Sequence, residues 1–259
     1  IINQEELWHN FFKNVDKNKY NIYIHYKKDS NNIKLKYFEQ YKIDNCIPTN
    51  WGDITLLHAH NILIKKAYDT DNCNYKFINL SQACIPLKSF DYIYNFLTKD
   101  NYGHFNVLTQ DSCFPRCDEL VNHIPKKYIH KSSNWFILNR NLANKISNVE
   151  STLIDKMYKN IMSPEEHYFI TGVYTNNMEN EIITTPNLPN GATTFTNWSD
   201  MDYKYVTTEY AVHPKAYDII SNDEAIYLVK DSLCLFGRKF TKDCDTSYIN
   251  KLLHHEAFT

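Results

Sequence analysis

The stretch YKFINLSQACIPLKSFDYIYNFL, residues 75–97, carries the pattern that decides the fold class. Its first six residues, 75–80, are rich in β-forming side chains and predict a strand. After Ser89, which can cap a helix, apolar residues recur at helical spacing as far as Leu97. A strand that leads into a helix is the repeating unit of an α/β fold.

The same alternation extends outward along the chain in both directions. Residues 5–12 open it with a helix-like stretch, and residues 109–132 and 176–191 are polar or irregular inserts. The pattern predicts strands at 21–26, 75–80, 104–108, 135–138, 193–196 and 232–236, and helices at 53–68, 89–97, 141–146, 152–160, 165–174 and 247–254. We therefore expect an α/β domain with one sheet of six strands.

The composition excludes several classes of protein. The chain has 5 Gly and 8 Pro in 259 residues, too few for a collagen-like or low-complexity protein. Lys and Arg number 28 against 30 Asp and Glu, a net charge of -2, so no nucleic-acid partner is expected. No apolar run reaches the roughly 18 to 20 residues that span a bilayer, so this segment is expected to make no membrane contact. We expect one domain over residues 1–259, with an N-terminal strand or anchor absent from this segment.

Three Asp-x-Asp pairs could hold a divalent cation, but position separates them. Only Asp200-Met201-Asp202 follows directly after a predicted strand, where two carboxylates can converge on Mg²⁺ or Mn²⁺. An acidic surface turn is the plainer interpretation of the same residues. His58-Ala59-His60 is no metal pair, because side chains two residues apart on a helix point in different directions.

The segment Ser163-Pro164-Glu165-Glu166 is the sharper candidate for chemistry. Ser163 can cap a helix, Pro164 suits its first position, and the two acids complement its positive end, so an ordinary helix start is one interpretation. The other is catalytic, because a carboxylate held in a helix's first turn can face a substrate as a general base.

A second candidate is Phe236-Gly237-Arg238-Lys239, where a predicted strand runs directly into two cations. A solvated pair at a strand end is the plainer interpretation. The functional alternative is a diphosphate site, because Arg contacts phosphate in a bidentate manner and Lys adds a compact positive charge. Trp198 is either a stacking platform for a sugar ring or a core tryptophan.

Five blocks in chain order cover nearly the whole sequence. They are Leu7-Trp8-x-x-Phe11-Phe12 leading to Tyr23-Ile24-His25-Tyr26, Trp51-Gly52, residues 77–88, residues 133–140 and residues 164–169. Together they resemble the core-2/I-branching enzyme family of glycosyltransferases, which includes animal β-1,6-N-acetylglucosaminyltransferases, protein xylosyltransferases and a large plant group. The resemblance implies a GT-A-like fold, with a Rossmann-like mixed sheet flanked by helices.

The resemblance also implies an activity: inverting, metal-independent transfer from a UDP-sugar, with GlcNAc or xylose expected, to a glycan or glycoprotein hydroxyl. No metal or other cofactor is expected, because the donor is a substrate. Family members usually sit in the Golgi lumen behind an N-terminal anchor, so a Golgi or ER location is expected if the full-length chain carries an anchor. A viral or similar source would place this domain in the cytoplasm.

The family's functional residues fall on specific positions of this sequence. The second acid of the family's Pro-acid-Glu motif, the catalytic base, falls on Glu166, and the basic residue that holds the donor diphosphate falls on Lys239, with Arg238 beside it. A further family arginine has no clean match, and Lys204 is a candidate stand-in. Lys27 stands where many animal members carry an acid on the nucleotide side.

Contacts to the transferred sugar or the acceptor are assigned to three more residues, Trp198, Glu165 and Arg116, the last from the long polar insert. Two alternatives to this enzyme stay open. One is a non-catalytic nucleotide-sugar or glycan binding protein on the same scaffold, suggested by Lys27. The other is a metal-dependent transferase that uses Asp200 and Asp202.

Overall fold

The computed structural model describes residues 2–27, 34–108, 116–184, 193–198 and 213–255. Within these residues the strands form a four-stranded sheet of order β1-β6-β3-β7, a three-stranded sheet of order β2-β9-β8, and the pair β4-β5. The bounds are β1 (Lys76–Ile78), β2 (Ile85–Pro86), β3 (Gly103–Phe105), β4 (Val107–Leu108), β5 (Lys131–Ser132), β6 (Ile137–Asn139), β7 (Ile182–Thr184), β8 (Thr194–Thr196) and β9 (Phe236–Arg238). Both larger sheets are mixed, because β3–β7 and β8–β9 are parallel whereas β1–β6, β3–β6 and β2–β9 are antiparallel.

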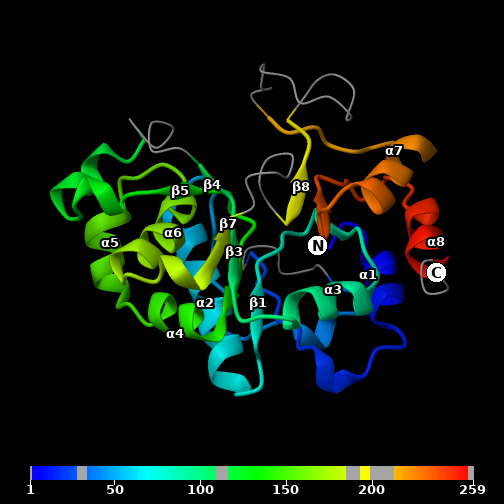
Figure 1. Cartoon of the computed structure of the whole chain (residues 1–259), viewed down its shortest axis with the longest axis horizontal. Helices are drawn as coiled ribbons and strands as arrows, with labels where there is room; N and C mark the ends of the chain where they lie inside the picture. Colours follow the sequence, from blue (N-terminus) through cyan, green and yellow to red (C-terminus); the bar gives the residue numbers. More distant parts are fainter. Residues whose placement is uncertain (1, 28–33, 109–115, 185–192, 199–212, 256–259) are drawn as a thin grey trace.

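Helices flank the sheets on the two sides of the molecule (Figure 1). The α-helices are α1 (Glu5–Phe12), α2 (Ile54–Thr70), α3 (Phe90–Thr98), α4 (Arg140–Ser147), α5 (Ser151–Tyr158), α6 (Glu165–Thr175), α7 (Asn222–Ile226) and α8 (Ser247–His255). A π-helical turn, Tyr227–Asp231, continues α7, and short 3-10 turns include Asp118–Asn122 and Lys126–Tyr128.

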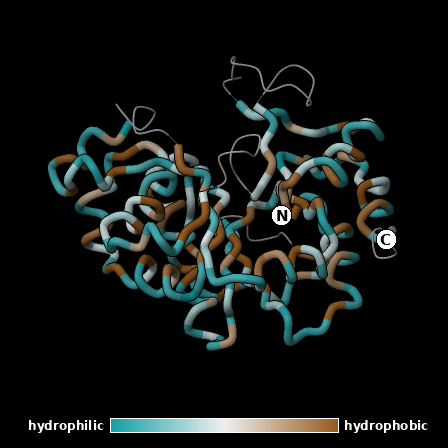
Figure 2. The backbone as a smooth tube through the Cα atoms, viewed as in Figure 1, coloured by the Kyte–Doolittle hydropathy of each residue, from teal (hydrophilic) through white to brown (hydrophobic). Residues whose placement is uncertain are grey.

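The four-stranded sheet and the helices α2, α4, α5 and α6 share one hydrophobic core. Phe136 lies in its centre, with ring centroids 5.4 Å from Phe105 and 4.5 Å from Phe169. Burial of such aromatic surfaces is the main stabilising contribution to a core of this kind. Figure 2 shows hydrophobic stretches along the strands in the middle of the molecule and hydrophilic ones along the outer loops.

The three-stranded sheet has a separate core, shared with α1, α7 and α8, in which Tyr217 stacks on Phe240 with ring centroids 4.8 Å apart. A third cluster joins the two halves. There, Ile137 of β6 packs with Phe236 of β9, and Trp8 of α1 contributes its ring and donates from Nε1 to the Cys84 carbonyl oxygen at 2.9 Å. The ends of β6 and β9 are thus held in one packed region.

The α/β class and the mixed sheet flanked by helices are confirmed, and so is every helix predicted from the periodicity. The prediction of one six-stranded sheet is wrong, because the strands divide between separate sheets. Residues 21–26 form no strand: Ile24 makes only an isolated bridge to Lys42. The last strand begins at Phe236, where the predicted strand of residues 232–236 ends, and residues 232–235 instead connect the π-helical turn to β9.

Among the described helices, none combines the length and apolar character that crossing a membrane requires.

Candidate active site

Glu165 and Glu166 occupy the first turn of α6. The chain enters this helix through Ser163, whose φ of 53° lies in the left-handed region and whose N–H donates to the Gly52 carbonyl oxygen at 3.0 Å. The Ser163 carbonyl oxygen accepts the N–H of Glu166, also at 3.0 Å. The residue that caps the helix is Pro164 and makes no side-chain capping bond, so the expected Ser163 cap is wrong by one position. Backbone contacts, including one to a distant loop, hold the acidic pair in place.

Glu166 is partly exposed and lies beside a cation. Its Oε2 is 3.3 Å from Nζ of Lys131, and 29% of the Glu166 side chain is accessible against 14% for Lys131. A carboxylate that solvent can reach is one that an acceptor hydroxyl can also reach. The ammonium pairs with the carboxylate without covering it, so the carboxylate stays accessible.

Glu165, its neighbour, is in a contrasting environment. Only 5% of the residue is exposed, and burial, with the negative charge of Glu166 as a smaller cause, raises the pKa of its carboxyl to about 7. Nδ2 of Asn134 donates to Oε1 at 3.5 Å, while Oε2 is buried without a hydrogen-bond partner in the described part of the chain. A carboxyl group whose pKa is raised by burial is a frequent feature of acid–base sites.

His167 completes the first turn as a neutral side chain. Burial, with smaller contributions from the positive charges of Lys131 and Arg116, lowers its pKa to about 4, although the hydrogen bond to the His130 backbone acts in the opposite direction. Its Nδ1 lies 3.2 Å from the carbonyl oxygen of His130. Arg116 is itself exposed, just before the 3-10 turn Asp118–Asn122, so its charge acts on the same helix start.

Arg238 ends β9 with its guanidinium stacked on an indole. Its Cζ lies 4.4 Å from the centroid of the Trp135 ring, and Nε is buried without a hydrogen-bond partner among the described residues. Burial lowers the pKa of Arg238, although a guanidinium stays charged at neutral pH. Lys239 is exposed, and its backbone carbonyl oxygen accepts from the N–H of Tyr217 at 2.8 Å.

One short segment, residues 131–135, links the acidic pair to the cations. Lys131 contacts Glu166, Asn134 contacts Glu165, and Trp135 carries Arg238 on its ring. The segment joins β5 to β6 and is tied to the end of β1, because Nδ2 of Asn79 donates to the Asn134 carbonyl oxygen at 2.8 Å. Residues 70 or more positions apart in the sequence therefore meet around five consecutive residues.

Of the remaining predicted site residues, only Trp198 lies in the part of the chain that the structure describes. Trp198 is half-buried and follows β8, where Thr196 is paired with Arg238 in the ladder. Lys204, Asp200 and Asp202 lie outside the described residues. No group of three His, Cys, Asp or Glu side chains arranged to hold a metal ion occurs in the part of the chain that the structure describes.

Sequence reasoning missed several residues of this region. Trp51 is 78% exposed and precedes Gly52, the partner of Ser163. Trp135 is half-buried and stacks on Arg238. Lys131 belongs to the long polar insert, where nothing in its spacing distinguishes it from Lys126 or Lys127. Its proximity to Glu166 arises only from tertiary contacts.

Comparison with known proteins identifies the family. The model of the Core-2/I-Branching enzyme family matches residues 1–232. The chain belongs to the core-2/I-branching enzyme family. It is 26% identical to xylosyltransferase 1 of Rattus norvegicus in an alignment of 277 positions that covers 93% of this chain and 32% of the relative. It is 25% identical to xylosyltransferase 1 of Homo sapiens, with coverage of 93% and 28%, respectively.

A plant relative matches a shorter part of the chain. Glycosyltransferase BC10 of Oryza sativa subsp. japonica is 23% identical over 154 residues, which are 57% of this chain and 38% of the relative. The chain thus spans about a third of the length of the curated relatives that it matches. The family and the names of these relatives agree with the prediction of a glycosyltransferase with a GT-A-like fold.

Proposed function

We propose that this core-2/I-branching domain is an inverting, metal-independent glycosyltransferase. It moves a sugar from a UDP-sugar to a hydroxyl of a glycan or glycoprotein, with Glu166 as the general base and Arg238 and Lys239 on the donor diphosphate. The observation that carries the proposal is the segment 131–135, which contacts both the acidic pair and Arg238.

The chemistry requires one proton acceptor. The acceptor oxygen attacks the anomeric carbon from the face opposite UDP while its proton passes to the Glu166 carboxylate, and a single displacement inverts that carbon. The Glu166 side chain is 29% exposed, whereas only 5% of Glu165 is exposed. Of the two, Glu166 is the one that an acceptor hydroxyl can reach, which favours it as the base.

The leaving group requires positive charge. As the bond from the anomeric carbon to the β-phosphate oxygen breaks, UDP takes both electrons, and fixed cations stabilise the charge that develops. Trp135 orients Arg238, whose Nε has no hydrogen-bond partner among the described residues, and the exposed Lys239 is accessible to a phosphate group of the donor. In this proposal the two cations take the role that a divalent metal plays in other transferases.

The donor sugar is proposed from the relatives. The two xylosyltransferases align across 93% of the chain, which favours UDP-xylose over UDP-N-acetylglucosamine. Trp51, exposed beside the start of α6, is a candidate platform for the acceptor, because an indole face packs well against sugar C–H groups or small side chains.

The decisive experiment measures UDP release from a panel of UDP-sugars, with and without EDTA. It compares the wild type with Glu166→Gln, and uses Glu150→Gln, at an exposed position, as the matched control. We expect turnover with one donor, unaffected by EDTA, a loss of about 10²-fold or more in Glu166→Gln with UDP binding retained, and no change in the control.

Other results would overturn parts of the proposal. Full activity in folded Glu166→Gln would exclude this residue as the base. Loss of activity in EDTA, reversed by Mg²⁺ or Mn²⁺, would favour a metal-dependent transferase using Asp200 and Asp202. UDP binding without turnover for any donor and acceptor would favour a binding protein, the alternative suggested by Lys27.

A further inference from the structure

Glu165 is a buried titratable side chain for which the reaction assigned to Glu166 has no use. It contacts Asn134, whose Nδ2 donates to Oε1 of Glu165 at 3.5 Å. Each of the two side chains also has a buried oxygen without a hydrogen-bond partner among the described residues, Oε2 in Glu165 and Oδ1 in Asn134. Two side chains in contact thus have one unpartnered oxygen each.

These two oxygens can bond to each other only through a proton. An ionised carboxylate has no donor and an amide oxygen is an acceptor, so Oε2 and Oδ1 cannot form a hydrogen bond while Glu165 is charged. A proton on Oε2 makes this atom a donor. The carboxylic acid and the Asn134 amide can then form a cyclic pair, with one bond from Nδ2 to Oε1 and a second from Oε2 to Oδ1. Buried polar groups in native proteins are seldom left unpartnered, which favours the protonated form.

The surroundings also favour a neutral Glu165. The titratable and charged groups of the elements around the start of α6 and the segment 131–135 are Asp53 before α2, Lys131 of β5, Arg238 of β9, and Glu166 and His167 of α6. Burial and, to a smaller extent, the charge of Glu166 raise the pKa of Glu165 to about 7, although a hydrogen bond with its own backbone acts in the opposite direction. Lys131 contacts Glu166 instead, and no cation in the described part of the chain forms an ion pair with Glu165.

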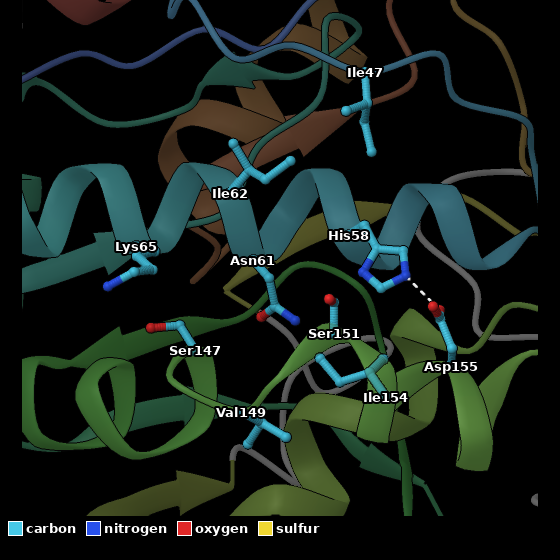
Figure 3. Close-up of a pocket in the computed structure, with 10 residues that line it drawn as sticks. All are labelled: Ile47, His58, Asn61, Ile62, Lys65, Ser147, Val149, Ser151, Ile154 and Asp155. Atoms are coloured by element: carbon cyan, nitrogen blue, oxygen red, sulfur yellow. Dashed lines mark hydrogen bonds and ion pairs between the residues drawn. The ribbon is translucent and has the colours of Figure 1, made fainter.

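A ligand in the neighbouring cavity does not supply the missing partner. This cavity, of about 430 Å³, lies between the middle of α2 and the connection from α4 to α5, and neither Glu165 nor Asn134 lines it. Figure 3 shows that two of its lining side chains are paired with each other, Nε2 of His58 with Oδ1 of Asp155 at 2.7 Å. The Asn134 amide is therefore the partner that the structure offers to Oε2 of Glu165.

We propose that Glu165 carries a proton in the active form of the domain and donates it in a hydrogen bond from Oε2 to Oδ1 of Asn134. Glu165 is then a positioning residue, because the cyclic pair fixes the segment 131–135 against the first turn of α6. The same segment holds Lys131 beside Glu166 and Trp135 against Arg238. The pair itself does not depend on the reaction, but its effect on catalysis rests on the proposed function, since that effect is exerted through Glu166.

The pair depends on pH in one direction. It is intact well below pH 7 and is broken as pH rises through the raised pKa of Glu165, about 7. Ionisation releases the proton to solvent and leaves Oε2 and Oδ1 as two acceptors with no donor between them. If only the protonated form holds the segment in place, kcat for sugar transfer is about tenfold lower at about pH 8 than at about pH 6, because the protonated fraction falls by that factor.

The first test detects the pair without any assay of activity. The side-chain amide of Asn134 is followed by NMR on the whole chain, labelled with ¹⁵N, across this pH interval. We expect its resonances to titrate with a midpoint at about pH 7 in the wild type and in the exposed control Glu150→Gln. In Glu165→Gln they should stay constant, because the Gln amide makes the same two bonds at every pH. Backbone amides of residues 131–135 should lose protection from hydrogen exchange, relative to Glu165→Gln, over the same interval.

The second test reads the effect on catalysis from the pH profile of kcat. We expect the decline of about tenfold between about pH 6 and about pH 8 in the wild type, and less than about twofold in Glu165→Gln. Asn134→Leu removes both bonds at every pH, so its kcat at about pH 6 should equal that of the wild type at about pH 8. Asn180→Leu makes the same chemical change at an exposed position and should behave as the wild type.

Several results would overturn the proposal. An Asn134 amide that does not respond to pH, or one that titrates equally in Glu165→Gln, would exclude the pair. A decline in kcat that persists in Glu165→Gln would exclude the positioning role. No turnover with any donor, together with a titrating amide and the expected exchange, would overturn the proposed function and support the pair. If Asn134→Leu fails to fold, the wild type and Glu165→Gln decide the outcome.

Discussion

Replacing Glu165 by Gln should make the stability of the domain less dependent on pH. Burial raises the pKa of this carboxyl from 4.5 to about 7 in the folded chain, so the folded state binds the proton more tightly than the unfolded state does. Well below pH 4.5 the Glu165 carboxyl is protonated in both states and does not lower the free energy of unfolding. As pH rises through the window from 4.5 to about 7, the unfolded chain loses its proton first and wild-type stability falls.

The size of the effect follows from the two pKa values. The full shift corresponds to about 3 kcal/mol at pH values above 7, and most of it, about 2.5 kcal/mol, develops between about pH 5 and about pH 8. Gln keeps the shape of the side chain and the contact to Asn134 but has no proton to lose. We therefore expect the free energy of unfolding of Glu165→Gln, relative to the wild type, to rise by about 2.5 kcal/mol over that interval.

The assay measures the free energy of unfolding in urea for the wild type and for Glu165→Gln, each at about pH 5 and at about pH 8. Glu150→Gln, at an exposed position, is the control. The buried histidines His60, His104 and His167 also titrate on unfolding, but they are common to all three proteins and cancel in the difference. A difference between wild type and Glu165→Gln that changes by less than about 0.5 kcal/mol from one pH to the other would refute the reasoning.

Three further changes test the site and its supporting core. Arg238→Gln should lower kcat for sugar transfer by about 10²-fold or more while the fold, followed by circular dichroism, is kept, because it removes a fixed cation from the leaving diphosphate; unchanged kcat would contradict that role. Lys131→Met should lower kcat for sugar transfer by about tenfold, since it removes the ion-pair partner 3.3 Å from Glu166 that fixes the position of this carboxylate, and an unchanged kcat would count against that role. Gly103→Ala should destabilise by at least about 2 kcal/mol in thermal unfolding, because the added methyl would lie 2.7 Å from Cδ1 of Leu142 and 2.9 Å from the Ile137 carbonyl oxygen. Gly172→Ala is the milder comparison, because its methyl would meet only the Ile146 side chain, at 3.3 Å.

The helices could be predicted from the sequence because their signals are local. The apolar spacing along residues 53–68 and the Ser89 cap act within a few turns, and the structure has α2 and α3 at these places. Strands were predicted less well. They are only two or three residues long here, and the partition of β1, β6 and β9 between sheets depends on pairings between distant residues. The isolated bridge of Ile24 shows the same limit, since β-forming residues make a strand only where a partner strand exists.

The sequence by itself determined the family, the α/β class and the candidates Glu166, Arg238 and Lys239, because side-chain type and order along the chain are enough to state those. The tertiary structure decided which of two adjacent glutamates is buried, that Lys131 accompanies Glu166, and that Trp135 carries Arg238. Burial and charge pairing are properties of neighbours in space, and folding brings those neighbours together from segments far apart in the chain.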